Sequence, residues 1–413
     1  MPDVDQELLE LTRSLVAENT VSVAGKNGDV QTQSTVRIAD IVCDRLESGG
    51  FTVRRFPYST NNVDKVNIIA TKGGDEPHLA LSGHMDVVPV GAWDPSPDPF
   101  RLTEQNGRFY ARGVADMKLF DACAILAASR VPVSDLKRPL AVYLTSDEEV
   151  GCLGIKQLLK RRRGDADTTS EFKVVSPAHE EVPIPKYVII GEPTGFVPMY
   201  MHKGYLFMRV FIRTQKEKPG HSSDPKSGAS VIKTGLPEVL VALNRLEREL
   251  QEIKDNRFAV PYPTTNPGVV GMGSGAAKNI LATSCWIDFE ARALPSTSPE
   301  DLFRTVSETV SRAVHGIPGI EASVQYMRSP TPPMETPIDS PVVQTARQLS
   351  GNKPQTVAYN TEGGTFNRYG AECVIFGPGS IAQAHTRDEY VDARWMQSDV
   401  LDLYERFIRT MCR

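Results

Sequence analysis

The chain lacks any apolar run long enough to cross a bilayer, since no stretch approaches the roughly 18 apolar residues that a spanning helix needs. The first residues, MPDVDQELLELTRSL, are acidic and amphipathic and contain neither the basic segment nor the apolar run of a signal peptide. The six cysteines are scattered with no CxxC pair, which in a chain of this length indicates reduced thiols. We therefore expect a cytoplasmic protein.

The chain also lacks a strong excess of charge of either sign. Its 46 basic and 51 acidic residues leave a formal charge of -5, whereas phosphate binding needs a concentrated basic surface. The one basic run, residues 160–163, is followed at once by Asp165 and Asp167, a pattern typical of a solvated loop. A GxSxG serine elbow is missing too. We expect neither nucleic acid nor a membrane as a partner, and no serine nucleophile of that kind.

What is present is a length of 413 residues, more than one hydrophobic core usually serves. The first half alternates helical and strand patterns, which indicates an α/β domain around a central sheet. Its short, continuous apolar strands are typical of a sheet covered on both faces. The predicted helices are 5–18, 36–46 and 118–129, and the predicted strands are 51–56, 67–71, 79–81, 140–145 and 187–190.

The pattern changes after residue 160. Residues 161–185 are polar, charged and interrupted by prolines, so we interpret them as a surface insertion. From residue 203 onward, strand and helix patterns follow in the order β-α-β-β-α-β, which is typical of a ferredoxin-like domain. A proline-rich linker then leads to elements that most simply rejoin the first domain. We predict an α/β catalytic domain with a large mixed sheet, formed by residues 1–202 and 328–413, and a smaller ferredoxin-like α+β domain, residues 203–327, inserted into it.

Five segments place acidic or imidazole side chains where ligands bind in open α/β sheets, immediately after apolar strands or in a nearby loop. Each residue alone has an ordinary structural explanation. A lone histidine is often satisfied in a core, an aspartate before a helix can cap it, and acids after a strand can form a solvated loop. The five segments are SGHMDVVP with His84 and Asp86, ARGVADMK with Asp116, LTSDEEVG with Asp147, Glu148 and Glu149, YVIIGEPTG with Glu192, and FGPGSIAQAH with His385.

Taken together, these segments supply enough ligands for a dinuclear metal site. Clustered carboxylates raise one another's pKa unless a cation lies among them. Mixed imidazole and carboxylate ligands suit zinc and its neighbours. Two ions bridged by one carboxylate would use five ligands and leave a sixth acid free as a general base.

In this order, the motifs resemble the successive signatures of the M20 metallopeptidase family, and they extend from residue 82 to residue 390. The resemblance implies two Zn²⁺ ions, for which Co²⁺ could substitute, and hydrolysis of the amide bond of a small N-acyl amino acid. It also implies that the small domain acts as a lid and dimer interface, and hence a homodimer. By the same resemblance, the metal ligands are His84, Asp116, Glu149, Glu192 and His385, with Asp116 bridging both ions, Asp86 orienting the first histidine, and Glu148 acting as the general base.

Within this family, the motifs are most similar to those of the acetylornithine deacetylases. The similarity lies in HKG at 202–204, GHSSDP at 220–225, VPYPTTNPG at 260–268, NTEGG at 360–364 and GPGSIAQAHTRDEY at 377–390. It implies conversion of N-acetyl-L-ornithine to L-ornithine and acetate, a step of arginine biosynthesis. The insertion at 161–185, and NTEGGTF in place of a Cys-Thr-Glu-Ala run, depart from the pattern and leave an aminoacylase or a desuccinylase as alternatives. An inactive metal-binding interaction protein is a third alternative, against which the intact set of matched residues argues.

Three further positions gain a role only through the resemblance. His221 matches a lid histidine that reaches the active site of the partner subunit and helps to hold the scissile carbonyl oxygen. Asn279 and Arg292 match lid positions associated with the carboxylate of the substrate, and a guanidinium suits bidentate carboxylate binding. Without the family, a surface turn and a surface arginine would be adequate explanations for His221 and Arg292.

The NTEGG segment suggests where the two ends of the substrate bind. Gly363 and Gly364 could offer backbone N–H donors to the α-carboxylate. Glu362 could bind a cationic tip such as the ornithine ammonium, because an unpaired charge in a closed site is costly. Alternatively, Glu362 only caps the helix predicted to begin near Gly364, where the helix dipole favours an acid.

Overall fold

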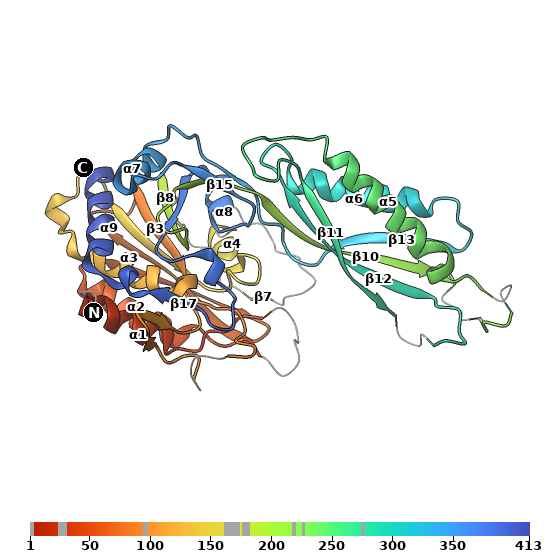
Figure 1. The fold of residues 1–413 in the computed structure, drawn as a ribbon, viewed down its shortest axis with the longest axis horizontal. Helices are drawn as coiled ribbons and strands as arrows, with labels where there is room; N and C mark the ends of the chain where they lie inside the picture. The colour runs from red at the N-terminus through yellow and green to blue at the C-terminus, as the bar shows by residue number, and fades with distance from the viewer. Residues whose placement is uncertain are drawn as a thin grey trace.

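The computed structural model describes residues 4–23, 31–93, 98–160, 174–175, 182–216, 220–224, 228–273 and 277–413. Most of the predicted surface insertion at residues 161–185 lies outside this part of the chain. Figure 1 shows a larger part built around a mixed sheet and a smaller, elongated part beside it. Within the described ranges, no helix is long and apolar enough to cross a membrane.

A ten-stranded mixed sheet forms the centre of the larger part. Its strands are β1 (Thr52–Thr60), β2 (Val63–Lys72), β3 (Leu79–His84), β6 (Leu140–Thr145), β7 (Val174–Val175), β8 (Tyr187–Pro193), β9 (Met199–His202), β14 (Met334–Glu335), β15 (Gln355–Val357) and β16 (Glu372–Gly377). They run in the order β14-β9-β16-β8-β3-β6-β2-β1-β7, with β15 paired to β9. The strands β16, β8, β3 and β6 are parallel neighbours, and every residue of β3, β6 and β8 is buried, as in sheets covered on both faces.

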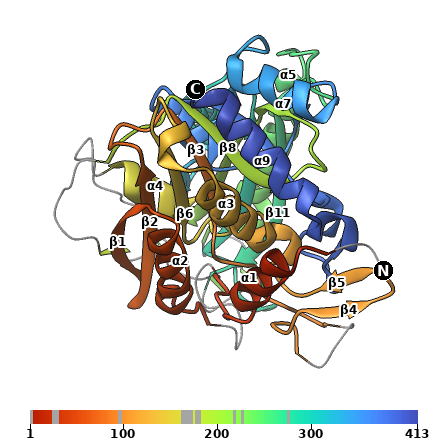
Figure 2. The ribbon, with the colours of Figure 1, turned by 90° about the vertical axis from the view of Figure 1, so that its left-hand side faces the viewer.

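Helices cover both faces of this sheet. The helices of the larger part are α1 (Gln6–Val16), α2 (Val36–Ser48), α3 (Leu119–Arg130), α4 (Leu153–Lys160), α7 (Pro341–Ser350), α8 (Gly363–Arg368) and α9 (Ser398–Met411). Alternate residues of a strand point to opposite faces, so Leu79 and Leu81 join the core formed with α1, α2, α3, α7 and α9, whereas Ala80 joins the core formed with α4 and α8. Figure 2 shows α3 and α9 lying across the first of these faces. The predicted mixed-sheet α/β fold is confirmed.

The smaller part has a sheet and a core of its own. Its elements are β10 (Gly204–Thr214), η3 (Val231–Gly235), α5 (Leu236–Leu250), β11 (Thr264–Met272), β12 (Ser284–Ala293), α6 (Pro299–Val314) and β13 (Ile320–Tyr326). The strands are antiparallel in the order β11-β12-β10-β13, with α5 and α6 in contact, which is the ferredoxin-like arrangement. Its buried apolar cluster contains no residue of the large sheet among those described. The domain boundaries and the role as a lid stay predictions.

Three short strands, β4 (Thr103–Gln105), β5 (Arg108–Tyr110) and β17 (Tyr390–Asp392), form a third sheet in the order β17-β5-β4. Strands of three residues have too few alternating positions to be predicted from a sequence pattern. This sheet brings a C-terminal segment beside the turn η1 (Val114–Lys118), which precedes α3. The remaining single turns are η2 (Val133–Asp135), η4 (Ile381–Gln383) and η5 (Ala393–Met396).

Candidate active site

The candidate site lies at the carboxyl ends of four adjacent parallel strands of the large sheet. His84 is the last residue of β3, and Glu192 is the next to last residue of β8. Glu149 follows β6, and the segment after β16 carries His385. Because β16, β8, β3 and β6 are parallel neighbours, their carboxyl ends lie side by side. The site is thus assembled from segments that are far apart in the sequence.

Asp116, in the turn before α3, lies between two imidazoles. Its Oδ1 is 3.0 Å from Nε2 of His84, and its Oδ2 is 3.3 Å from Nε2 of His385. Oε1 of Glu192 is 3.8 Å from the same nitrogen of His84, and Oε2 of Glu149 is 3.1 Å from Nε2 of His385. The structure therefore brings the five predicted ligands together around Asp116, with Glu192 near His84 and Glu149 near His385.

The hydrogen bonding of His84 favours a cation beside its Nε2. Nδ1 lies 3.0 Å from the main-chain oxygen of Asp86, which can only accept a hydrogen bond, so Nδ1 carries the proton. Nε2 faces the oxygens of Asp116 and Glu192; burial alone would lower the pKa of His84, but Asp116 raises it well above its ordinary value, so Nε2 carries a proton unless a metal cation takes its place. A divalent cation among these atoms would be bound by all of them. Ligand atoms of His84, Asp116 and Glu149 also lie within 4.8 Å of one another, so Glu149 approaches this side of the cluster as well.

The charge balance of the cluster points the same way. Burial, together with the negative charge of Asp116, raises the pKa of Glu149 to about 8 and raises the pKa of Glu192 well above its ordinary value. Hydrogen bonds to Asp116 and Glu149 raise the pKa of His385 to about 11. Positive charge is therefore favoured at the centre of the cluster. The ligand types, the burial and the charges fit a dinuclear metal centre.

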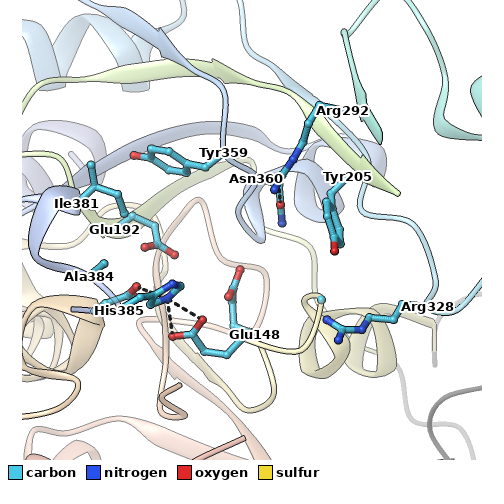
Figure 3. Close-up of a pocket in the computed structure, with 13 residues that line it drawn as sticks. Glu148, Glu192, Tyr205, Arg292, Arg328, Tyr359, Asn360, Ile381, Ala384 and His385 are labelled. Atoms are coloured by element: carbon cyan, nitrogen blue, oxygen red, sulfur yellow. Dashed lines mark hydrogen bonds and ion pairs between the residues drawn. The ribbon is translucent and has the colours of Figure 1, made fainter. Parts of the chain in front are cut away.

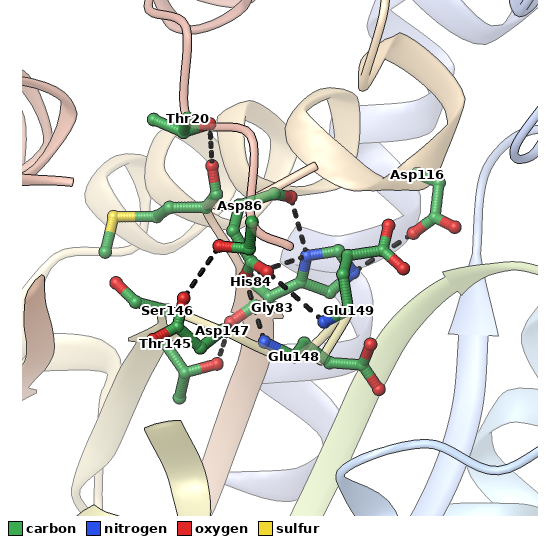
Figure 4. A network of polar contacts seen from close by, with 12 residues as sticks. Thr20, Gly83, His84, Asp86, Asp116, Thr145, Ser146, Asp147, Glu148 and Glu149 are labelled. Atoms are coloured by element: carbon green, nitrogen blue, oxygen red, sulfur yellow. Dashed lines mark hydrogen bonds and ion pairs between the residues drawn. The ribbon is translucent and has the colours of Figure 1, made fainter. Parts of the chain in front are cut away.

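Asp86 organises the turn that carries the adjacent glutamates. Its carboxylate accepts the backbone N–H of Glu148 at 3.0 Å and that of Glu149 at 3.2 Å (Figure 4). From the sequence we expected this carboxylate to orient His84. The main-chain oxygen of Asp86 is closer to Nδ1 of the imidazole, however, at 3.0 Å against 3.6 Å for Oδ1. Asp86 thus orients His84 through its backbone and holds the turn through its side chain.

The first acid of the DEE run, Asp147, has a structural role. Its carboxylate forms a buried ion pair with Lys65, at 2.7 Å. It also accepts hydrogen bonds from the hydroxyl groups of Ser22, Tyr58 and Thr60. The three acids of this run therefore do not act as one cluster, because this one is already satisfied by a buried cation and three donors.

A cavity of about 390 Å³ opens onto the acid and imidazole cluster (Figure 3). Glu148 lines this cavity, and the thiol of Cys152 donates a hydrogen bond to Oε1 of Glu148 at 3.1 Å. Burial raises the pKa of Glu148 above its usual range, which suits a group that must take up a proton. Lining residues outside the cluster include Tyr205, Arg292, Arg328, Tyr359 and Asn360.

Arg292 lines the cavity from strand β12 of the smaller sheet. Its Nε donates to Glu290 at 2.8 Å, its Nη1 donates to Oδ1 of Asn360 at 2.8 Å, and its guanidinium lies 4.5 Å from the ring centre of Tyr205. Arg328 also lines the cavity, although the sequence did not single it out. In the sequence it lies between β13 and the proline-rich linker, outside every recognised motif. The signal that could have been used for Asn360 is its place at the start of the NTEGG segment.

His221 and Asn279 lie outside the cavity of their own chain. Both residues are exposed, and they lie in loops at the end of the smaller sheet where β10 finishes at Thr214. The two loops are adjacent, because the backbone N–H of Ser222 donates to the main-chain oxygen of Asn279 at 3.0 Å. Gly204, at the other end of β10, follows β9 of the large sheet directly. The 11 residues of β10 span about 33 Å at 3.3 Å per residue. The structure therefore separates these two residues from Arg292.

Glu362 lies behind the cavity wall. It is 2% exposed, is not among the described residues that line the cavity, and accepts a 2.5 Å hydrogen bond from the hydroxyl of Thr145. Burial raises its pKa to about 8. It precedes α8 without a capping hydrogen bond from its side chain, so the structure does not support the capping explanation.

The amides of Gly363 and Gly364 already have acceptors within the chain. The N–H of Gly363 donates to Oγ1 of Thr361 at 3.1 Å, and the N–H of Gly364 donates to Nε2 of His202 at 3.1 Å. Both glycines are buried in the first turn of α8. In this arrangement, neither amide is available to the carboxylate of a substrate, contrary to the expectation from the sequence.

Comparison with known proteins adds an independent line of evidence. The model of peptidase family M20/M25/M40 matches residues 80–410. Acetylornithine deacetylase from Myxococcus xanthus is 36% identical over 401 residues, which cover 95% of this chain and 94% of that protein. Acetylornithine deacetylase from Proteus mirabilis (strain HI4320) is 33% identical over 407 residues, which cover 98% of this chain and 96% of that protein.

Solved structures of lower identity share the fold. A tripeptidase from Staphylococcus aureus superposes with a TM-score of 0.67 at 19% identity, covering 99% of this chain and 98% of that one. Aminopeptidase PepT from Bacillus cereus has a TM-score of 0.68 at 18% identity, with 99% and 100% covered. A dinuclear metal-binding M20 peptidase from Bacillus subtilis has a TM-score of 0.62 at 11% identity, with 98% and 97% covered. At these identities, the likeness establishes the fold alone.

Proposed function

Because this chain belongs to peptidase family M20/M25/M40, we propose that it is a metal-dependent amidohydrolase that removes the acyl group from a small N-acyl amino acid. The family resemblance predicted from the motifs is confirmed. The names of the relatives favour N-acetyl-L-ornithine as the substrate, which would place the reaction in arginine biosynthesis.

Two Zn²⁺ ions are the proposed cofactors, with Co²⁺ as a substitute. His84, Asp116 and Glu192 would hold one ion, and Asp116, Glu149 and His385 the other, since each imidazole has Asp116 and one of the two glutamates near its Nε2. When bound, the ions would supply Lewis-acid activation of water and of the amide carbonyl.

Glu148 is the proposed general base. Glu148 and its neighbour Glu149 both line the cavity, but Glu149 lies against His385, whereas the partner of Glu148 is the thiol of Cys152. The carboxylate of Glu148 would take the proton of the attacking water and then deliver it to the leaving amine. The thiol of Cys152, which donates to its Oε1, would hold the side chain in place during both transfers.

A homodimer is the proposed assembly. His221 is exposed at the far end of the smaller sheet, so it can serve catalysis only in the cavity of another subunit. There it would donate a hydrogen bond to the oxygen of the acyl carbonyl as negative charge develops on it. Asn279 shares this pair of loops and would enter the same cavity.

Arg292 is the proposed partner of the substrate's α-carboxylate, because its guanidinium lines the cavity. Glu362 is the candidate for the ornithine ammonium. It would have to exchange its hydrogen bond from Thr145 for one from the substrate. The two ends of the substrate would thus be recognised by opposite charges.

The two guanidinium groups of Arg292 and Arg328 favour a second candidate function. Both line the cavity, whereas the buried Glu362 does not. A substrate with two carboxylates, such as a succinylated amino acid, would use both cations. The second candidate is therefore a desuccinylase with the same mechanism.

One observation carries the proposal: Asp116 lies between two imidazoles at the floor of a cavity that a further carboxylate, Glu148, also lines. The decisive experiment is a deacylation screen of acetylated, succinylated and formylated amino acids with zinc or cobalt added. We expect turnover of N-acetyl-L-ornithine that requires the metal. Two bound zinc ions without turnover of any acyl amino acid would contradict the proposal and favour the inactive metal-binding protein.

A further inference from the structure

The segment that follows His385 packs against the segment that carries Asp116. Strand β17 pairs antiparallel with β5. This pairing brings Glu389, just before β17, beside Arg112, just after β5. His385 lies four residues before Glu389, and Asp116 lies four residues after Arg112. The contacts of Glu389 and Arg112 therefore bear directly on how far apart the two proposed ligands lie.

The carboxylate of Glu389 accepts four hydrogen bonds from the Asp116 segment. Its Oε1 accepts the backbone N–H of Ala115 at 2.9 Å and that of Asp116 at 3.1 Å. Its Oε2 accepts the backbone N–H of Gly113 at 3.0 Å and a guanidinium N–H of Arg112 at 2.6 Å. The side chains of Glu389 and Arg112 are each 1% exposed, so these bonds are shielded from water.

Arg112 extends the network to two further segments. Its Nη2 donates to the main-chain oxygen of Thr386 at 2.9 Å, directly after His385. The same nitrogen lies 3.4 Å from the oxygens of Pro89 and Val90, in the segment that follows β3. One buried ion pair thus connects three segments that carry proposed metal ligands or their supports.

These segments need such a connection because they leave regular structure. Gly113 has a φ of 82° and His385 a φ of 61°, so neither segment continues there as a strand or an α-helix. Backbone N–H groups outside a helix or sheet must find other acceptors when buried. Glu389 supplies that acceptor for three of them. Neither Glu389 nor Arg112 is among the described residues that line the cavity, so they act through others.

We propose that Glu389 and Arg112 are positioning residues that hold Asp116 and His385 at the separation required by the proposed ion that these two residues share with Glu149. This inference rests on the metal site of the proposed function. His84 and Glu192 lie on strands of the large sheet, which hold them without this ion pair.

The two ions should therefore respond differently when the pair is disturbed. Of the group formed by Asp116, Glu149 and His385, two members lie on segments that the pair connects. Of the other group, only Asp116 does. Loosening the pair should lower the affinity for the ion held by Asp116, Glu149 and His385 more than the affinity for the ion held by His84, Asp116 and Glu192.

Glu389→Gln is the primary test, because it keeps the size of the side chain but places an NH₂ group against N–H donors. Stepwise Zn²⁺ affinities are measured by competition with a chromophoric chelator, and Co²⁺ absorption spectra report the ligand geometry. Mutation of a residue that hydrogen-bonds to a metal ligand typically lowers metal affinity by roughly 10–100-fold. We expect a loss of that size in the zinc step that fills the group of Asp116, Glu149 and His385, a smaller loss in the other step, and an altered spectrum for the Co²⁺ bound to that group.

Asp288→Asn is the matched control. Asp288 pairs with Arg209 through hydrogen bonds at 2.6 and 3.0 Å on the smaller sheet, far from the proposed ligands. The Asp288→Asn variant should leave both stepwise zinc affinities unchanged. The proposal is overturned if folded Glu389→Gln binds both zinc ions as the unmodified chain does, or loses no more affinity than this control.

Arg112→Lys keeps the test decisive if Glu389→Gln does not fold. Lysine preserves the charge beside Glu389 but cannot also reach the oxygen of Thr386. We expect a folded protein in which one of the two zinc steps is several-fold weaker, and unchanged affinity in both steps would refute the proposal. The unmodified chain is measured first, since failure to bind zinc at all would contradict the proposed function rather than this inference.

Discussion

Replacing Glu148 by glutamine should separate proton transfer from metal binding. The change preserves the shape of the side chain and removes its charge and basicity. The hydrogen bond from the thiol of Cys152 can be kept, because the amide oxygen of glutamine also accepts. The distances that define the two metal groups involve Glu149 and not Glu148. We therefore expect both zinc ions to remain bound.

The expected loss lies in turnover. General base catalysis contributes roughly 10²–10⁴-fold, and a tenfold change in rate corresponds to about 1.4 kcal/mol, so the barrier should rise by about 3–5 kcal/mol. The matched variant is Glu149→Gln at the next position. It removes a carboxylate that lies 3.1 Å from Nε2 of His385, and should therefore release zinc as well as abolish activity.

The assay compares kcat on N-acetyl-L-ornithine, zinc content and thermal unfolding for the two variants and the unmodified chain. Thermal unfolding ensures that a loss of activity is not a loss of fold. If Glu148→Gln loses as much zinc as Glu149→Gln, the assignment of base and ligand within the pair is wrong. If Glu148→Gln keeps most of its turnover, another group must take the proton.

Four further outcomes are expected. Chelation should abolish hydrolysis and Zn²⁺ or Co²⁺ should restore it, whereas full activity of a metal-free preparation would refute the mechanism. Among the ligand variants, Asp116→Ala should lose the most activity, because both imidazoles contact this carboxylate. A His221→Ala variant mixed with a Glu148→Gln variant should regain activity through hybrid dimers, whereas a fully active monomer at assay concentration would contradict the shared site. N-Acetyl-L-ornithine should exceed N-acetyl-L-norvaline in kcat/KM and Glu362→Gln should narrow the gap, while equal values would argue for a general aminoacylase. Arg328→Gln should raise KM for a succinylated substrate more than for its acetylated counterpart, and an equal effect on both would remove the support for a desuccinylase.

Much of the fold could be predicted from the sequence, because it depends on local patterns. The predicted strand 140–145 coincides with β6, whose residues are all apolar except the last and are all buried. Helix α1 begins after Asp5, whose side chain accepts the N–H of Leu8, as its capping preference suggests. His84 and Glu192 could be recognised because each stands at the carboxyl end of a buried apolar strand, where open sheets bind ligands.

The roles of neighbouring acids could not be assigned in this way. Asp147 and Glu149 are two residues apart, yet one pairs with the buried Lys65 and the other with His385. Asp86 supports His84 through its main-chain oxygen, a contact that its side-chain type does not predict. A segment does not reveal which distant group its side chains will meet.

The sequence by itself thus determined the elements of the fold and the residue types available at the sheet edge. Only the tertiary structure decided which of these groups face the cavity and which are already satisfied. From the sequence, the backbone N–H of Gly364 was expected to be available to the substrate, but in the fold it donates to His202. Arg328 and Glu389 belong to no local pattern that indicates their contacts, yet one lines the cavity and the other holds the Asp116 segment. The reason is physical: a hydrogen bond or an ion pair belongs to two groups, and here the partners lie on segments that only folding brings together.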